Sequence, residues 1–130
     1  MSPTQLESAA HTFTTTELFL FSAVSWHPHR IHFDQDYTRD VEGHPDLLVH
    51  GPLQAIHLCR YLTELIGPTR VLKVESKHLS PLHVGVPATL EGTLVGPGEE
   101  PDTDVYEVWM SLESTGARTT TCTITTGRPS

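Results

Sequence analysis

One segment constrains the fold of this chain more than any other, a strongly apolar helix in the middle of the sequence. The pattern predicts this helix over Pro52–Ile66, because proline suits the first helical turn and Gly67-Pro68 stops a helix. Apolar residues cover most of its circumference, and a helix of that kind is a buried one. A single narrow stripe of polar residues interrupts this surface: His57, Arg60 and Glu64.

The chain after this helix consists of strand-like segments rich in Val, Thr, Leu, Tyr and Trp. Short turn sequences with Gly, Pro or Ser separate them, and consecutive strands with short connections are antiparallel neighbours by default. The expected strands are Arg70–Leu79, Pro87–Val95, Val105–Ser114 and Arg118–Thr126. The sequence therefore predicts an α+β fold with one long buried helix wrapped by an antiparallel β-sheet.

The sequence before this helix predicts only short helices or turns. Thr14 and Glu17 have the spacing of a capping box, and the apolar run behind them predicts a short helix or turn that Pro28 terminates. A second short helix is expected over Asp34–Val41. Residues Met1–His11 are small and polar, and we expect them to be frayed and disordered.

Length and charge limit the possible partners. A chain of 130 residues is expected to form a single domain, residues 1–130. Its net charge of −8 argues against nucleic acid or an anionic membrane surface as the main partner. No apolar run reaches the roughly 18 residues of a spanning helix, and Met1–Ala10 lacks the regions of a secretory signal. Cys59 and Cys122 match no CxxC pattern, so we expect reduced thiols and a cytoplasmic location.

Histidine is concentrated in the middle of the chain, where eight of the nine histidines fall between His27 and His83. Imidazole exchanges protons near neutral pH, so this region is expected to carry the chemistry. The segment His27–Asp34 clusters three imidazoles and a carboxylate. The segment Val49–Leu53 opens the buried helix, whose first N–H groups suit a developing oxyanion, and Gly51 allows close approach to the backbone.

These two segments resemble the MaoC-like (R)-specific enoyl-CoA hydratases of the hotdog fold, through Ile31-His32-x-Asp34, Tyr37 and Val49-His50-Gly51. The closer similarity is to 3-hydroxyacyl-thioester dehydratases and mesaconyl- or itaconyl-CoA hydratases, and it runs from about Phe13 to Thr126. The resemblance implies a single hotdog domain. It also implies a hydratase or dehydratase that acts on the double bond of an enoyl thioester, acyl-CoA or carrier-bound, without a cofactor.

The resemblance implies a role for each motif residue. His32 matches the general acid/base of the family, and the backbone N–H of Gly51 matches the donor that polarises the thioester carbonyl. The usual aspartate partner of the histidine is replaced by His27, which becomes the candidate for the second catalytic group. The candidates for the substrate pocket are Trp26, His29, Arg30 and His50, of which His50 is also a candidate anchor for the loop that enters the helix.

Several alternatives stay open at this point. The resemblance implies a homodimer with active sites near the interface, or a heterodimer with a second hotdog subunit. The missing aspartate favours a non-catalytic subunit that shapes the pocket of an active partner, and a thioesterase is the third function class. No metal site is expected, since the H-x-H-x-x-H spacing fits no standard zinc pattern and no cysteine is close. Ser22 lacks the context of a nucleophile elbow.

Overall fold

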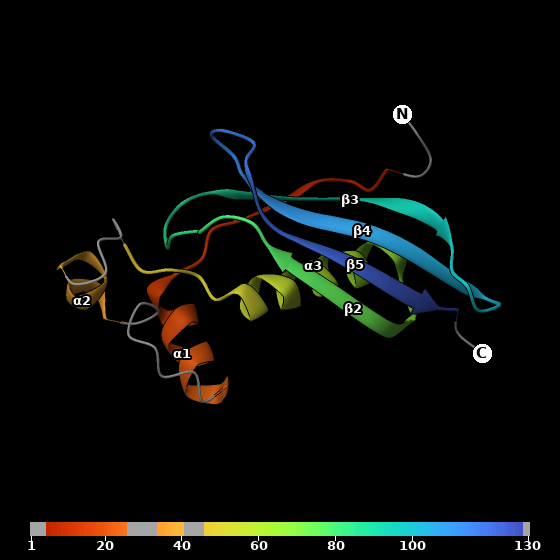
Figure 1. Cartoon of the computed structure of the whole chain (residues 1–130), viewed down its shortest axis with the longest axis horizontal. Helices are drawn as coiled ribbons and strands as arrows, with labels where there is room; N and C mark the ends of the chain where they lie inside the picture. Colours follow the sequence, from red (N-terminus) through yellow and green to blue (C-terminus); the bar gives the residue numbers. More distant parts are fainter. Residues whose placement is uncertain (1–4, 26–33, 41–45, 129–130) are drawn as a thin grey trace.

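A five-stranded antiparallel sheet packs against one long helix in the computed structural model, which describes residues 5–25, 34–40 and 46–128 (Figure 1). The predicted α+β architecture is confirmed. The helices are α1 (Thr15–Ser25), α2 (Gln35–Asp40) and α3 (Gly51–Ile66). The strands are β1 (Ala9–His11), β2 (Arg70–His78), β3 (Ala88–Pro97), β4 (Thr103–Leu112) and β5 (Arg118–Gly127).

Helix α3 ends at Ile66 as predicted and begins at Gly51, one residue before the predicted start. Proline occupies the first turn, and Gly67 closes the helix at a φ of 82° while its N–H donates to the Thr63 carbonyl at 3.1 Å. Leu58 and Leu62 are fully buried and belong to the core formed with β3, β4 and β5. The predicted packing of the helix in the core is confirmed, but a single sheet covers only one side of it. Ile56 and Leu65 remain exposed.

The strand order is β1-β3-β4-β5-β2. The expected antiparallel pairing of consecutive strands is confirmed for β3 with β4 and β4 with β5. It is wrong for β2, which pairs with β5 at the edge of the sheet. The connection from β2 to β3 is not a tight turn. It runs past the segment that enters α3, where the Val49 N–H donates to the Leu82 carbonyl at 2.8 Å and the Val84 N–H to the Leu47 carbonyl at 2.9 Å.

The expected disorder of the first eleven residues is corrected for the part that the structure describes. Strand β1 pairs with β3 in antiparallel register, and the Leu6 N–H donates to the Gly92 carbonyl at 2.9 Å. The Tyr61 hydroxyl donates to the Glu7 carbonyl, and burial together with nearby acidic charges raises the pKa of Tyr61 to about 12. The open edge of β3 explains the ordering, because its unpaired backbone groups are a template for another strand.

The capping box at the start of α1 is confirmed. The Glu17 N–H donates to Thr14 Oγ1 at 3.1 Å, and the Thr14 N–H donates to Glu17 Oε1 at 3.3 Å. Helix α2 lies within the predicted range, although Val41 falls outside the described residues. Pro28 lies outside them as well.

Two further expectations from the sequence concern membrane-spanning helices and the two cysteines. Among the described helices, none combines the length and hydropathy that crossing a membrane requires. Cys59 and Cys122 are free thiols, and burial raises the pKa of Cys122 to about 11 and raises that of Cys59 too. Both thiols are therefore protonated near neutral pH.

The capping box yields a stability prediction. Thr14→Ala removes the hydroxyl that accepts the Glu17 N–H, and loss of such a cap lowers the free energy of unfolding by about 1 kcal/mol. Urea denaturation of the wild type and variant measures the change. Thr16→Ala is the matched control, since Thr16 is exposed in the first turn of α1 and alanine favours a helix. Equal stability losses in both variants would contradict the assigned cap.

Candidate functional site

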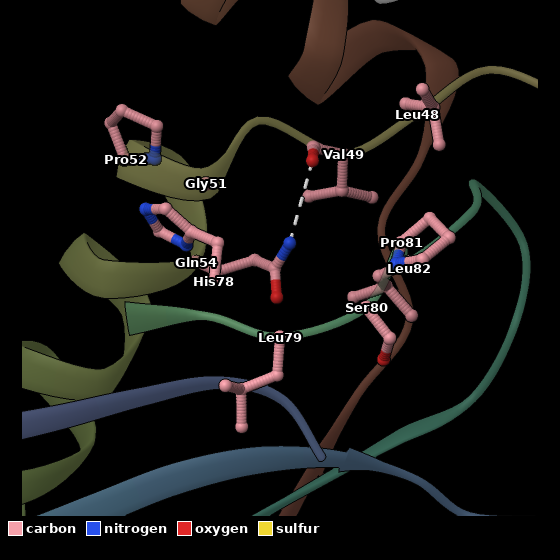
Figure 2. Close-up of a pocket in the computed structure, with 10 residues that line it drawn as sticks. All are labelled: Leu48, Val49, Gly51, Pro52, Gln54, His78, Leu79, Ser80, Pro81 and Leu82. Atoms are coloured by element: carbon pink, nitrogen blue, oxygen red, sulfur yellow. Dashed lines mark hydrogen bonds between the residues drawn. The ribbon is translucent and has the colours of Figure 1, made fainter. Parts of the chain in front are cut away.

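A cavity of about 370 Å³ lies at the N-terminal end of α3 (Figure 2). Three parts of the chain form it: the segment that enters α3, the first turn of α3, and the end of β2 with the residues that follow. The lining residues are Leu48, Val49, Gly51, Pro52, Gln54, His78, Leu79, Ser80, Pro81 and Leu82. The lining is mostly apolar with a few polar groups, as in sites for small molecules.

Gly51 and His78 are in close contact at this cavity. A Cβ atom built on Gly51 would lie 2.5 Å from Cε1 and 2.6 Å from Nε2 of the His78 ring, so the ring covers the backbone of the helix start. The first intrahelical bond of α3 runs from the Gln54 N–H to the His50 carbonyl. The backbone N–H groups that come before Gln54 in the first turn of α3 have no intrahelical acceptor. They lie at the positive end of the helix dipole. This end of the cavity is therefore suited to an oxyanion.

A buried polar network connects the first turn of α3 to β5 and β2. Gln54 Oε1 accepts hydrogen bonds from Thr119 Oγ1 at 2.8 Å and from Thr120 Oγ1 at 2.9 Å. The amide Nε2 of the same glutamine donates to the Val49 carbonyl at 3.4 Å. Thr120 Oγ1 also lies 3.1 Å from His78 Nδ1. The network fixes the start of the helix relative to the sheet.

The same network assigns the tautomer of His78. The Thr120 hydroxyl has one proton, which it donates to Gln54, so its lone pair accepts from an Nδ1–H of His78. The neutral ring then carries its lone pair on Nε2, one of three ring atoms that lie close to Gly51. No role is predicted from the sequence for His78, Gln54 or Thr120. Gln54 is the one with a detectable signal, because it is a polar residue on the buried face of an apolar helix.

His50 is fully buried, and its Nε2 lies 2.7 Å from the Ser22 hydroxyl oxygen. Its ring also makes an edge contact with Phe21 of α1, with centroids 4.7 Å apart. This position against α1 fits the anchoring role considered for His50, and a direct contact with substrate stays a prediction. The distance between this serine and histidine is also that of the nucleophile and the base in a catalytic triad. Ser22 is only 7% exposed, however, and sits within a helix rather than at an elbow.

The other predicted site residues lie outside the described residues: Trp26, His27, His29, Arg30 and His32. Their roles stay predictions. The described elements that flank them in sequence are α1 and α2, and both lie on the side of the sheet where α3 begins (Figure 1).

Comparison with known proteins adds family information to this geometry. Residues 1–84 match the family model described as hydroxyacyl-thioester dehydratase type 2. A mesaconyl-C(4)-CoA hydratase of Chloroflexus aurantiacus is 54% identical over 41 residues, which are 32% of this chain. The match spans only 15% of the length of that relative.

Solved structures share the architecture over the whole chain. An (R)-hydratase from A. caviae involved in PHA biosynthesis superposes with a TM-score of 0.88 at 19% identity, over 99% of this chain and 98% of that one. A chain of the ChsH1-ChsH2 complex from Mycobacterium tuberculosis superposes with a TM-score of 0.84 at 15% identity, over 99% and 100% of the two chains. At these identities the likeness shows the fold, and it confirms the predicted hotdog architecture.

The contact between Gly51 and His78 can be tested by a double-mutant cycle. Gly51→Ala displaces the His78 ring and breaks its hydrogen bond with Thr120, so we expect a loss of about 1 kcal/mol in unfolding free energy. In the background of His78→Ala the new methyl group has room, so Gly51→Ala should lower the unfolding free energy much less. Urea denaturation of the four proteins gives the coupling energy. Additive effects would show that the ring does not cover Gly51.

Proposed function

We propose that this chain, which belongs to the hydroxyacyl-thioester dehydratase type 2 family, adds or removes water at the double bond of an enoyl thioester. The acyl group would be carried by coenzyme A or by an acyl-carrier protein. The observation that carries the proposal is the cavity at the N-terminal end of α3, where the Gly51 backbone and the His78 ring meet. The similarity to a mesaconyl-C(4)-CoA hydratase supports the same chemistry.

The proposed mechanism places the thioester carbonyl at the start of α3. In hydration, a base removes a proton from water, the water oxygen bonds to the β-carbon, and the electron pair of the double bond moves to form an enolate. The Gly51 N–H and the helix dipole stabilise the enolate oxygen. A general acid then protonates the α-carbon, and one molecule of water has been added. Dehydration is the reverse sequence.

The proton transfers are assigned to histidines. His32 is proposed as the general acid/base, and His27 as the second catalytic group in place of the family's aspartate. The free pKa of imidazole, about 6.5, suits both steps near neutral pH. The described elements on either side of this motif, α1 and α2, lie at the end of the sheet where α3 begins, which supports the assignment. His78 is a further candidate for contact with the substrate, because it lines the cavity.

We further propose that the chain functions as a dimer through strand β2. This strand is an edge of the sheet and all nine of its residues are exposed. Three of them are large and apolar: Val71, Leu72 and Val74. The unpaired backbone groups of this edge, together with these apolar side chains, favour pairing with another strand, although four of the nine residues are charged. Since β2 ends at His78, a partner on this edge would lie next to the cavity.

The identity of the partner has two alternatives. A second copy of the chain is the first proposal, because it needs no other gene product. A second hotdog chain is the alternative, and the M. tuberculosis structure of similar fold is a complex of two differently named chains. In that case this chain could be the non-catalytic subunit considered from its missing aspartate.

Hydration of crotonyl-CoA by the purified chain tests the proposed activity. We expect His32→Ala to lower the rate by roughly 10²–10⁴-fold, the contribution of a positioned general acid/base. Loss of the enoyl-thioester absorbance measures hydration, and release of free thiol would instead indicate a thioesterase. His44→Ala is the control, since it removes another histidine of the same region to which no role is assigned. Full activity in His32→Ala would exclude the assigned role.

The role of His27 is tested in the same assay. His27→Asp restores the family pattern, so activity should be preserved or raised. His27→Ala should lower the rate by a factor similar to that of His32→Ala if the two histidines act as a unit. An unchanged rate in His27→Ala would leave His32 or a group of a partner subunit to activate water. No hydration by the wild-type chain alone would favour the non-catalytic subunit.

The dimer is tested by light scattering at micromolar concentration. We expect the wild type to have the mass of two chains and Val74→Lys to have the mass of one, because the substitution replaces an apolar side chain of the edge with a further positive charge beside Lys73. Val95→Lys is the matched control, since Val95 is exposed on β3 away from the β2 edge. A monomeric wild type, or equal disruption by both variants, would contradict an interface at β2.

A further inference from the structure

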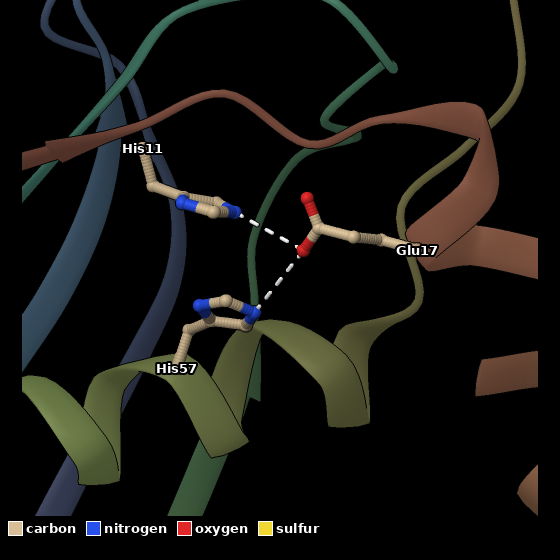
Figure 3. A group of neighbouring side chains, drawn as sticks. All are labelled: His11, Glu17 and His57. Atoms are coloured by element: carbon tan, nitrogen blue, oxygen red, sulfur yellow. Dashed lines mark hydrogen bonds and ion pairs between the residues drawn. The ribbon is translucent and has the colours of Figure 1, made fainter. Parts of the chain in front are cut away.

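Three side chains converge outside the cavity described above: His11 at the end of β1, Glu17 in the first turn of α1 and His57 on α3 (Figure 3). Glu17 Oε2 lies 3.2 Å from His11 Nε2 and 3.5 Å from His57 Nε2. One ligand atom from each of the three residues lies within 4.8 Å of the other two. The side chains are 30%, 31% and 19% exposed in the same order, so an ion from solvent can reach them.

The surrounding residues hold these side chains in place. The buried ring of Phe13 makes edge contacts with both histidines, at centroid distances of 4.5 Å to His11 and 4.8 Å to His57. The capping box engages the other carboxylate oxygen of Glu17, because Oε1 accepts the Thr14 N–H at 3.3 Å. Oε2 is thereby turned toward the histidines. Such outer contacts orient the ligands of metal sites.

The two separations from the Glu17 oxygen suit the coordination of a transition metal, and the two histidine nitrogens lie within 4.8 Å of each other. Zinc binds histidine nitrogen and carboxylate oxygen at roughly 2.0–2.2 Å, so neighbouring ligands of a tetrahedral site are about 3.3 Å apart. The two separations from the Glu17 oxygen, 3.2 and 3.5 Å, are close to this value. The two imidazole rings lie with their centroids 4.4 Å apart, so both are close to the Glu17 oxygen.

We propose that His11, Glu17 and His57 bind a divalent transition-metal ion, for which Zn²⁺ is the best match to two imidazoles and one carboxylate. Three protein ligands leave a fourth position. A cavity of about 330 Å³ lined by both histidines, Arg60 and Glu64 lies beside them, with space for water or a small anion.

Binding at this site would connect β1, α1 and α3 through one ion. Because the unfolded chain cannot present ligands from three separate elements together, the ion stabilises the folded state. The inference does not depend on the proposed hydratase activity, since none of its ligands lines the cavity at the start of α3.

The test uses the full chain after treatment with a chelator and dialysis. Calorimetric titration with zinc chloride should give one ion per chain, and Zn²⁺ should raise the thermal unfolding midpoint while Mg²⁺ does not, because Mg²⁺ prefers oxygen ligands. Titration with Co²⁺ should give the visible absorption of a tetrahedral nitrogen and oxygen site. Absence of zinc binding at micromolar concentration would overturn the proposal.

Two variants locate the ion. Glu17→Gln keeps an oxygen acceptor for the capping box but loses the carboxylate charge, so it should fold normally and bind Zn²⁺ at least about tenfold more weakly. His57→Ala should weaken binding similarly. The matched controls are Glu107→Gln, an exposed carboxylate paired with Arg118, and His44→Ala. Wild-type affinity in both Glu17→Gln and His57→Ala, or equal weakening in the controls, would place the ion elsewhere and overturn the proposal.

Discussion

Burial of one face of α3 against β3, β4 and β5 is the constraint on which the rest of the structure depends. The helix contributes fully buried leucines to the core, and its direction across the sheet determines where its N-terminal turn emerges. The cavity lies at that turn, so the packing of the core also determines the position of the cavity. Exposed apolar residues on the uncovered side of α3 and on β2 show where the single chain leaves apolar surface in water.

Gln54 fixes the position of the first turn of α3 relative to the sheet. It lies on the buried face of α3, where an unsatisfied amide would be costly, and its partners come from β5 and from the segment before the helix. Through Thr120 the network reaches His78, whose ring covers Gly51. A buried polar network of this kind specifies a position that apolar contacts alone would leave adjustable.

One turn after Gln54, α3 shows a second use of polar groups at His57. Glu17 caps α1 with one carboxylate oxygen and contacts two histidines with the other, so a single side chain connects local helix chemistry to a tertiary cluster. The sequence pattern does not predict this cluster, because His11 and His57 are distant in sequence and have no ligand spacing between them.

The sequence by itself determined the local elements and the family. Pro52 and Gly67 set the bounds of α3, Thr14 and Glu17 set the start of α1, and the motif around His32 indicates the chemistry. Only the tertiary structure decided that β2 pairs with β5, that β1 completes the sheet, and that the Gln54 and Glu17 clusters form. The physical reason is that periodicity and capping act over a few neighbouring residues, whereas strand pairing and side-chain clusters depend on how distant segments close around the buried helix.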